Sequence, residues 1–248
     1  MNRKLTAVLL IAAAVVTNVA FTALGTVFNY PDVLKDPVQE ILAAFRTHET
    51  TVTAWFALMA LAAALMAPIA VGVGRLSNHP AMRAAVPVGI AAAVVQVIGL
   101  ARWPLLVPGF AADAASADPT VAAAARDSFL LAHHILGNLI GETFGYLLTA
   151  AWTLLVVIAL RRGFAGLWFT LLGAVSAVLI VAGALSPLNL PLIDDANFIG
   201  YVLWSVWLVI FAVLLLLGRP RTGTTAAERA LSDSDSDSDS HSPSQSTR

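Results

Sequence analysis

Six long stretches of the sequence contain almost no charged residue, and this feature limits the fold more than any other. Each stretch reaches the ~20 apolar residues that a helix needs to cross the ~30 Å hydrocarbon core of a membrane. A backbone in lipid must satisfy its own hydrogen bonds, and a helix does so within one segment. We therefore predict an all-α fold, a polytopic membrane bundle of six transmembrane helices. The predicted spans cover approximately residues 5–28, 52–74, 85–107, 132–160, 167–187 and 197–217.

The overall composition excludes an ordinary water-soluble enzyme. Only 12% of the 248 residues are charged and 58% are hydrophobic, whereas a typical soluble domain carries roughly 25% charged residues. The 14 Lys and Arg residues are balanced by 15 Asp and Glu residues, so no basic excess indicates a nucleic-acid partner. The predicted partner is the lipid bilayer, with no nucleic acid. Because the chain has no cysteine, disulfides and thiolate metal sites are excluded.

Lys and Arg are unevenly divided between the predicted connections. If the N-terminus is cytoplasmic, ten of these residues lie on the cytoplasmic side and four on the other side. Cytoplasmic loops carry an excess of Lys and Arg, so we predict a multi-pass protein of the cell (plasma) membrane with both termini cytoplasmic. A cleaved signal peptide is the alternative for the N-terminus, although the first apolar run is longer than the roughly 7–15 residues of a signal core.

The C-terminal part of the chain differs sharply from the rest. Residues 219–248 are polar, and residues 232–240 alternate strictly between Ser and Asp. Low hydrophobicity with self-repelling charge cannot offset the entropy of ordering. We therefore predict a six-helix transmembrane domain at residues 1–218 and a disordered cytoplasmic tail at residues 219–248. An acidic docking or phosphorylation segment is the alternative to a dispensable tail.

Two of the predicted outer loops contain an Asp-Pro pair, at residues 36–37 and 118–119. Asp is a favourable helix N-cap, and Pro is favoured at the first helical position. We predict that each pair starts a helix on the outer side that runs into, or abuts, the next span. An apolar stripe with helical spacing follows the first pair and consists of Val38, Ile41, Leu42 and Phe45. The six spans then form three hairpins, with short amphipathic or extended helices on the outer side.

The fourth predicted span contains the densest pattern of polar residues. His134, Asn138 and Glu142 follow one another at four-residue spacing and therefore lie on one face of a helix. An ionisable residue at membrane depth is costly, so Glu142 needs a partner or a neutralising proton. We take this polar stripe as the candidate functional site.

A stripe of small residues lies beside the polar stripe and predicts close helix packing. It consists of Gly137, Gly141 and Gly145. The packing could occur within one bundle or between two copies in a homodimer. Gln96 in the third span and Asn18 in the first are expected to form hydrogen bonds between helices.

Arg102 in the third span is predicted to lie at the same depth as Glu142. Arg102 follows the basic loop residue Arg83 by 19 residues, and Glu142 precedes Arg161 by 19 residues, which is roughly 28 Å of helix in each case. We predict an Arg102–Glu142 ion pair as the structural interpretation. A catalytic or proton-carrying Glu142 is the alternative, since desolvation offsets much of the attraction in a buried pair.

The histidines are the only candidate metal or haem ligands of note. His48 precedes the second span, and His133 and His134 lie in the fourth, so they could meet at the outer mouth of the bundle. No short ligand spacing typical of zinc sites fixes them. We predict no cofactor and no catalytic residue, and a haem or divalent metal at these histidines is the alternative.

Three segments resemble a family of uncharacterised membrane proteins. They are residues 28–34 (FNYPDVL), residues 86–104 with Gln96, Gly99 and Arg102, and residues 141–146 (GETFGY). These segments resemble a group of actinobacterial six-helix integral membrane proteins known as a domain of unknown function, over approximately residues 5–217. The resemblance implies a six-helix fold and no particular activity.

The sequence leaves two classes of function open. The first is a non-enzymatic membrane protein, either a structural or accessory component or a small-molecule carrier. The second is an intramembrane redox or metal-dependent enzyme with a His/Glu site near the outer membrane face. The chain contains no hydrolase or nucleotide-binding motif, and this favours the first class.

Overall fold

The computed structural model describes residues 2–161, 164–188 and 192–218. In these residues every regular element is a helix, which confirms the predicted all-α fold. The chain divides into two units, residues 1–216 and residues 217–248, and the fold below is that of the first unit. The predicted tail, residues 219–248, lies outside the described residues.

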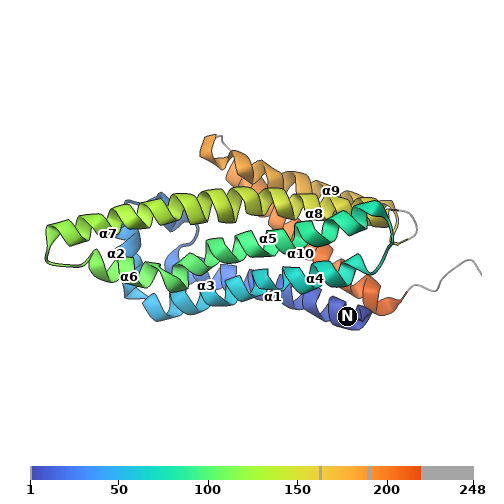
Figure 1. Ribbon diagram of the computed structural model, residues 1–248, viewed down its shortest axis with the longest axis horizontal. Coiled ribbons are helices and arrows are strands. Elements are labelled where there is room, and N and C mark those ends of the chain that lie inside the picture. The colour runs from blue at the N-terminus through green and yellow to red at the C-terminus, as the bar shows by residue number, and fades with distance from the viewer. Residues whose placement is uncertain (1, 162–163, 189–191, 219–248) are drawn as a thin grey trace, which may run out of the picture. The chain divides into compact units, whose positions relative to one another are not determined.

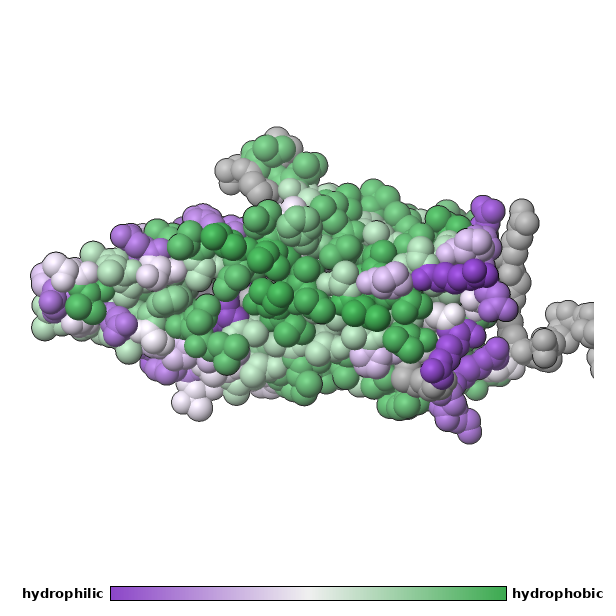
Figure 2. Space-filling view, in the orientation of Figure 1, coloured by the Kyte–Doolittle hydropathy of each residue, from purple (hydrophilic) through white to green (hydrophobic). Residues whose placement is uncertain are grey.

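Six helical stretches in the described residues are long and apolar enough to cross a membrane, so the chain is a multi-pass membrane protein. They are α1 (Arg3–Phe28), α3 and α4 (Glu49–Ala64 and Met66–Gly74), α5 and α6 (Pro80–Leu105 and Val107–Asp113), α7, η2 and α8 (Pro119–Ala132, His133–Phe144 and Gly145–Leu160), α9 and η3 (Leu167–Ala182 and Gly183–Leu188), and α10 (Ile193–Leu217). Between the first two stretches lie the 3-10 helix η1 (Asp32–Lys35) and helix α2 (Val38–Thr47). Figure 2 shows apolar surface along the helices and hydrophilic side chains gathered at both ends, as a bilayer requires.

Consecutive spans pack against one another as the three predicted hairpins. Helix α1 packs against α3 and α4, and α5 packs against η2 and α8 (Figure 1). Helices α9 and α10 meet at Gly200, where an added Cβ would lie 2.7 Å from the backbone nitrogen of Ile180. Contacts of α5 with α3 and α4, and of α8 with α9, join the hairpins into one bundle.

The third and fourth spans continue well beyond the predicted boundaries. The stretch Pro119–Leu160 has 42 residues and extends roughly 63 Å at 1.5 Å per residue, about twice the thickness of the hydrocarbon core. The excess length lies at one end of the bundle, where α2, α6 and α7 pack together at the left of Figure 1. We call this end the distal end. Helices α2 and α7 are the two helices expected after the Asp-Pro pairs, whereas α6 was not expected.

The two Asp-Pro pairs behave differently in the structure. Asp118 caps α7 as predicted, because its carboxylate accepts a hydrogen bond of 2.8 Å from the backbone N–H of Thr120. Helix α2 begins directly after Pro37 with no side-chain cap, whereas Asp36 ends the preceding 3-10 helix. Burial of its apolar stripe stabilises α2 instead, and the buried members are Ile41, Leu42 and Phe45.

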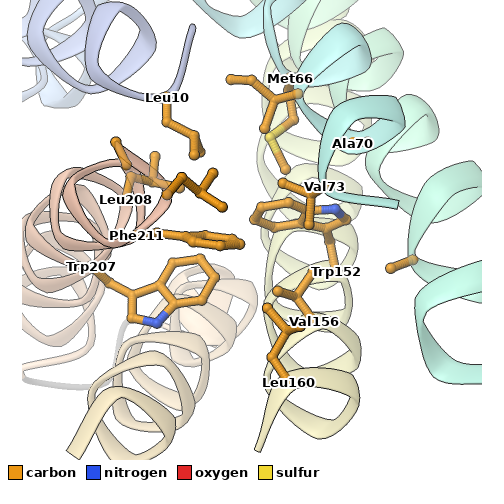
Figure 3. Packing of buried hydrophobic residues seen from close by; sticks show 14 of the residues in the cluster. Leu10, Met66, Ala70, Val73, Trp152, Val156, Leu160, Trp207, Leu208 and Phe211 are labelled. Carbon is orange, nitrogen blue, oxygen red and sulfur yellow. The ribbon is translucent and has the colours of Figure 1, made fainter. Parts of the chain in front are cut away.

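Two apolar clusters form the interior of the bundle. In the first, Leu10, Met66, Trp152 and Phe211 come from α1, α4, α8 and α10 and point toward one another (Figure 3). The second lies toward the distal end around Trp103, whose ring stacks on Phe56 at 4.6 Å between centroids. Along α5 the fully buried members of the first cluster end at Ala93 and those of the second begin at Trp103. The polar residues Gln96 and Arg102 of α5 lie between them.

Candidate functional site in the fourth span

The polar residues of the fourth span lie in a π-helix rather than an α-helix. The π-helix η2, His133–Phe144, continues directly from α7 and into α8. Its wider winding brings the Thr143 hydroxyl within 2.9 Å of the backbone carbonyl of Asn138, five residues earlier, to which it donates a hydrogen bond. Long π-helical stretches are rare, and π-helical turns occur frequently at functional sites. The sequence analysis assumed α-helical winding here and missed this feature.

The small-residue stripe of the fourth span lies against α5 of the same chain. A Cβ added to Gly99 would lie 2.6 Å from the Cα of Gly141, so the two backbones are in direct contact. A Cβ on Gly145 would lie 3.3 Å from Cγ of Gln96, and one on Gly137 would lie 2.7 Å from Nη2 of Arg102. The stripe is therefore covered by the third span, and no second copy of the chain is needed to bury it.

Side-chain hydrogen bonds also join different spans of the bundle. Gln96 Nε2 donates to the Thr149 hydroxyl at 2.7 Å, and Asn18 Nδ2 donates to the Ser205 hydroxyl at 2.9 Å. Both bonds join different spans, which confirms the roles expected for Gln96 and Asn18. A further bond, from the Trp204 indole N–H to the Thr153 hydroxyl at 2.8 Å, was not expected from the sequence.

Arg102 is held on the α5 side of η2 and is almost completely buried. The residue is 5% exposed, and its guanidinium lies over Gly137. Nη1 donates to the backbone carbonyl of Gly99, and Nη2 lies 3.4 Å from Nδ1 of His133. The guanidinium carbon also lies 5.4 Å from the centroid of the Trp103 ring. Nε has no hydrogen-bond partner in the described part of the chain.

Glu142 is half-buried in η2 and has no direct partner. Among the described residues no side chain or backbone group forms a hydrogen bond or ion pair with its carboxylate. Its oxygens are also not among the fully buried unpartnered atoms, so they retain accessible surface. Glu142 and Arg102 are close enough to interact electrostatically but form no ion pair. The guanidinium turns instead toward Gly99 and His133, which is why the predicted contact is not made.

All three tyrosines of the chain lie within electrostatic reach of Glu142. They are Tyr30, Tyr146 and Tyr201, from the turn after α1, from α8 and from α10. The rings of Tyr146 and Tyr201 meet edge to face at 5.9 Å between centroids. The sequence analysis missed these residues. Tyr146 could have been found, because it follows Glu142 by four residues, but the other two are brought to the site only by the tertiary fold.

Tyr30 lies in the connection between the first two spans and responds to both charges. Burial raises the pKa of its hydroxyl to about 12, with the negative charge of Glu142 adding to the rise and the positive charge of Arg102 opposing it. Its ring packs edge to face against Phe56 at 5.2 Å and Phe21 at 5.9 Å. At neutral pH the hydroxyl is therefore protonated and can donate a hydrogen bond at the distal side of the site.

The structure does not gather the remaining predicted residues into one group. His134 is exposed, whereas Asn138 and Glu142 are half-buried, because π-helical winding shifts residues four apart off a common line. His48 is exposed at the junction of α2 and α3. His133 stacks on Phe129 with ring centroids 5.9 Å apart.

Metal ligation by the histidines would have to overcome local charge. In the residues that the structure describes, no three His, Asp or Glu side chains are grouped so that they could hold a metal ion. The cationic group of Arg102 lies beside Nδ1 of His133 and would repel a metal cation bound to that nitrogen.

One known family matches most of the chain. Residues 5–212 match the family described as Domain of unknown function (DUF4386). The chain belongs to this family. No curated protein and no solved structure matches the chain. The resemblance to an uncharacterised domain family is thus confirmed, and its actinobacterial part stays a prediction.

Proposed function

We propose that this member of the family is a non-enzymatic membrane protein that binds a small molecule beside Glu142, as a carrier or an accessory component. The observation that supports the proposal is the unpartnered carboxylate of Glu142 within a membrane-spanning stretch. A charge at that depth is costly, and such residues are retained for function. The buried guanidinium of Arg102 on the facing helix supplies a second charge, and its Nε has no hydrogen-bond partner among the described residues.

Single and double substitutions distinguish a binding site from a structural ion pair. If the two charges stabilise each other, Arg102→Met and Glu142→Gln should each cost about 3–5 kcal/mol, and the double variant should recover much of the loss. We expect a different result. Glu142→Gln should leave thermal unfolding in detergent unchanged or raise its midpoint, because it removes a desolvated charge and breaks no contact. Arg102→Met should lower the midpoint, since the guanidinium contacts Gly99 and His133.

Glu40→Gln, at an exposed position of α2, is the matched control for replacing a carboxylate by an amide. Two destabilised single variants with recovery in the double variant would refute the binding role of Glu142. The purified protein also separates the two classes of function. A Soret band or stoichiometric metal would favour a redox or metal-dependent enzyme that uses His133 or His134.

We further propose that the protein lies in the plasma membrane with both termini cytoplasmic. The first apolar cluster contains Ala7, Val73, Met82 and Leu160, so the ends of α1, α4, α5 and α8 meet there. The basic residues next to these helix ends are Arg3, Lys4, Arg75, Arg83 and Arg161. A cytoplasmic side rich in Lys and Arg supports this orientation. A homodimer stays a prediction.

A further inference from the structure

We infer that the site beside Glu142 accepts a hydrophobic organic cation, such as a quaternary ammonium or phosphonium compound. This inference rests on the proposed small-molecule site and names the chemical class of its ligand. It follows from which charge in the site is accessible, and from the kind of side chain that surrounds it.

The accessible charge in the site is negative. Arg102 is 5% exposed, is covered by Gly137 and Trp103, and already donates to the Gly99 carbonyl. Its guanidinium therefore offers an anion little surface. The carboxylate of Glu142, in contrast, has accessible oxygens and accepts no hydrogen bond from the described residues.

The surrounding charges also favour a cation. Asp194 at the start of α10 acts electrostatically on Glu142 and on Tyr146 and adds a second negative charge. Its carboxylate accepts only the hydroxyl of Ser186, at 2.8 Å, among the described residues. Lys35 forms an exposed ion pair of 2.8 Å with Asp32, and its charge also acts on Asp194, so it offsets part of this negative charge. The accessible groups on η2 and α10 therefore attract positive charge.

The aromatic side chains suit a cation that carries apolar groups. Tyr146 follows Glu142 by one helical turn, and its ring meets that of Tyr201 at 5.9 Å, which in turn meets Trp204 at 6.2 Å. Cations bind the faces of Trp and Tyr rings, and aromatic groups recognise quaternary ammonium ligands in this way. A second set of rings, Phe21 with Phe198 at 6.1 Å, extends the apolar surface toward Tyr30.

The absence of a side chain at Gly183 allows Tyr146 and Asn197 to pack closely against the end of α9. A Cβ at this position would overlap with Nδ2 of Asn197 and would lie 2.8 Å from Cε2 of Tyr146. Asn197 in turn donates to the backbone carbonyl of Ile180 at 2.8 Å. The end of α9 therefore approaches both α8 and α10 closely, which holds Tyr146 beside Tyr201.

Binding of tetraphenylphosphonium to the full chain in detergent, measured by isothermal titration calorimetry, tests the inference. Tetraphenylborate is the control ligand, because it has nearly the same size and shape and the opposite charge. We expect the phosphonium to bind with at least tenfold higher affinity than the borate. Glu142→Gln should weaken phosphonium binding at least tenfold, and Glu40→Gln should leave it unchanged.

Two substitutions at Tyr201 keep the test valid if Glu142→Gln fails to fold. Tyr201→Leu removes the ring and should weaken phosphonium binding roughly 2- to 30-fold, whereas Tyr201→Phe keeps the ring and should retain binding. Equal affinity for the two ions, or phosphonium binding unaffected by both Glu142→Gln and Tyr201→Leu, would overturn the inference. Binding of the borate that is lost in Glu142→Gln would overturn the cation class and still support a small-molecule site. The small-molecule site itself would be refuted if the double variant Arg102→Met with Glu142→Gln recovered the stability that both single variants lose.

Discussion

The close contact between α5 and η2 makes Gly99→Ala a decisive substitution. An alanine Cβ at this position would lie 2.6 Å from the Cα of Gly141 and 3.1 Å from the carbonyl oxygen of Leu136. Both are backbone atoms, so no flexible side chain can move aside and the two helices must separate. We expect the variant to be destabilised, because separation also disturbs the hydrogen bond between Gln96 and Thr149.

The size of the effect follows from two opposing contributions. Replacing glycine by alanine inside a helix gains about 0.5–1 kcal/mol from backbone entropy, whereas overpacking a close contact costs about 1–3 kcal/mol and occasionally more. A contact between two backbones lies at the upper end of that range, so we expect a net loss of about 1–2 kcal/mol. For a domain of this size the loss corresponds to roughly 2–8 °C in the unfolding midpoint.

Gly109→Ala is the matched control for this measurement. Gly109 is an exposed residue of α6, and no atom lies within 4 Å of a Cβ added there. The control should therefore unfold at the wild-type temperature or slightly above it. Both variants can be compared by intrinsic tryptophan fluorescence during heating in detergent. If Gly99→Ala is as stable as Gly109→Ala, the backbone contact between α5 and η2 does not hold the bundle together as described.

Three further predictions concern other parts of the chain. Because the chain has no cysteine, Asp118→Cys should be labelled by an impermeant thiol reagent on intact cells and Ser77→Cys should not, and the reverse pattern would invert the proposed orientation. Hydrogen bonds from Thr120 lower the pKa of Asp118. The capping of α7 by Asp118 is therefore present at neutral pH and is lost as the pH falls through this lowered pKa. Asp118→Ala should speed amide exchange in the first turn of α7 at neutral pH, and unchanged exchange would contradict the cap. Thr149→Val should leave the amide of Gln96 without its partner and lower the free energy of unfolding by about 1 kcal/mol. The double variant Gln96→Leu with Thr149→Val should lose less stability than the sum of the two single variants. Additive losses would argue against the bond.

The features that the sequence predicted well are those encoded by neighbouring residues. Gaps between charges define the six spans, because each span must satisfy the same requirement of apolar length within one segment. The Asp118 cap and the buried stripe of α2 likewise depend on a few adjacent positions. Asp36 shows the limit of this reasoning. The same Asp-Pro pair occurs there, but Asp36 caps the C-terminal end of the preceding 3-10 helix instead of the start of α2.

The features that the sequence did not predict depend on the rotation of residues about a helix axis and on contacts between distant segments of the chain. Counting residues placed Arg102 and Glu142 at one depth, and they do lie within electrostatic reach of each other. A count gives position along a helix axis, but not the direction in which a long side chain turns. The guanidinium of Arg102 instead contacts the backbone carbonyl of Gly99 and the ring of His133. The π-helical winding of η2 also has no periodic signature in the sequence, so a stripe predicted from four-residue spacing does not allow for it.

The packing of η2 and the position of Glu142 are parts of one arrangement. Gly137 and Gly141 fix one side of η2 against Arg102 and Gly99 through contacts that leave no room for a Cβ. A return of this segment to α-helical winding would rotate Glu142 relative to these glycines, because each residue would then turn further about the axis. The glycine contacts thus hold the carboxylate at a position where, among the described residues, no group forms a hydrogen bond or ion pair with it. Because the close backbone packing of η2 sets this position, the arrangement argues against a role of Glu142 as one half of a structural ion pair.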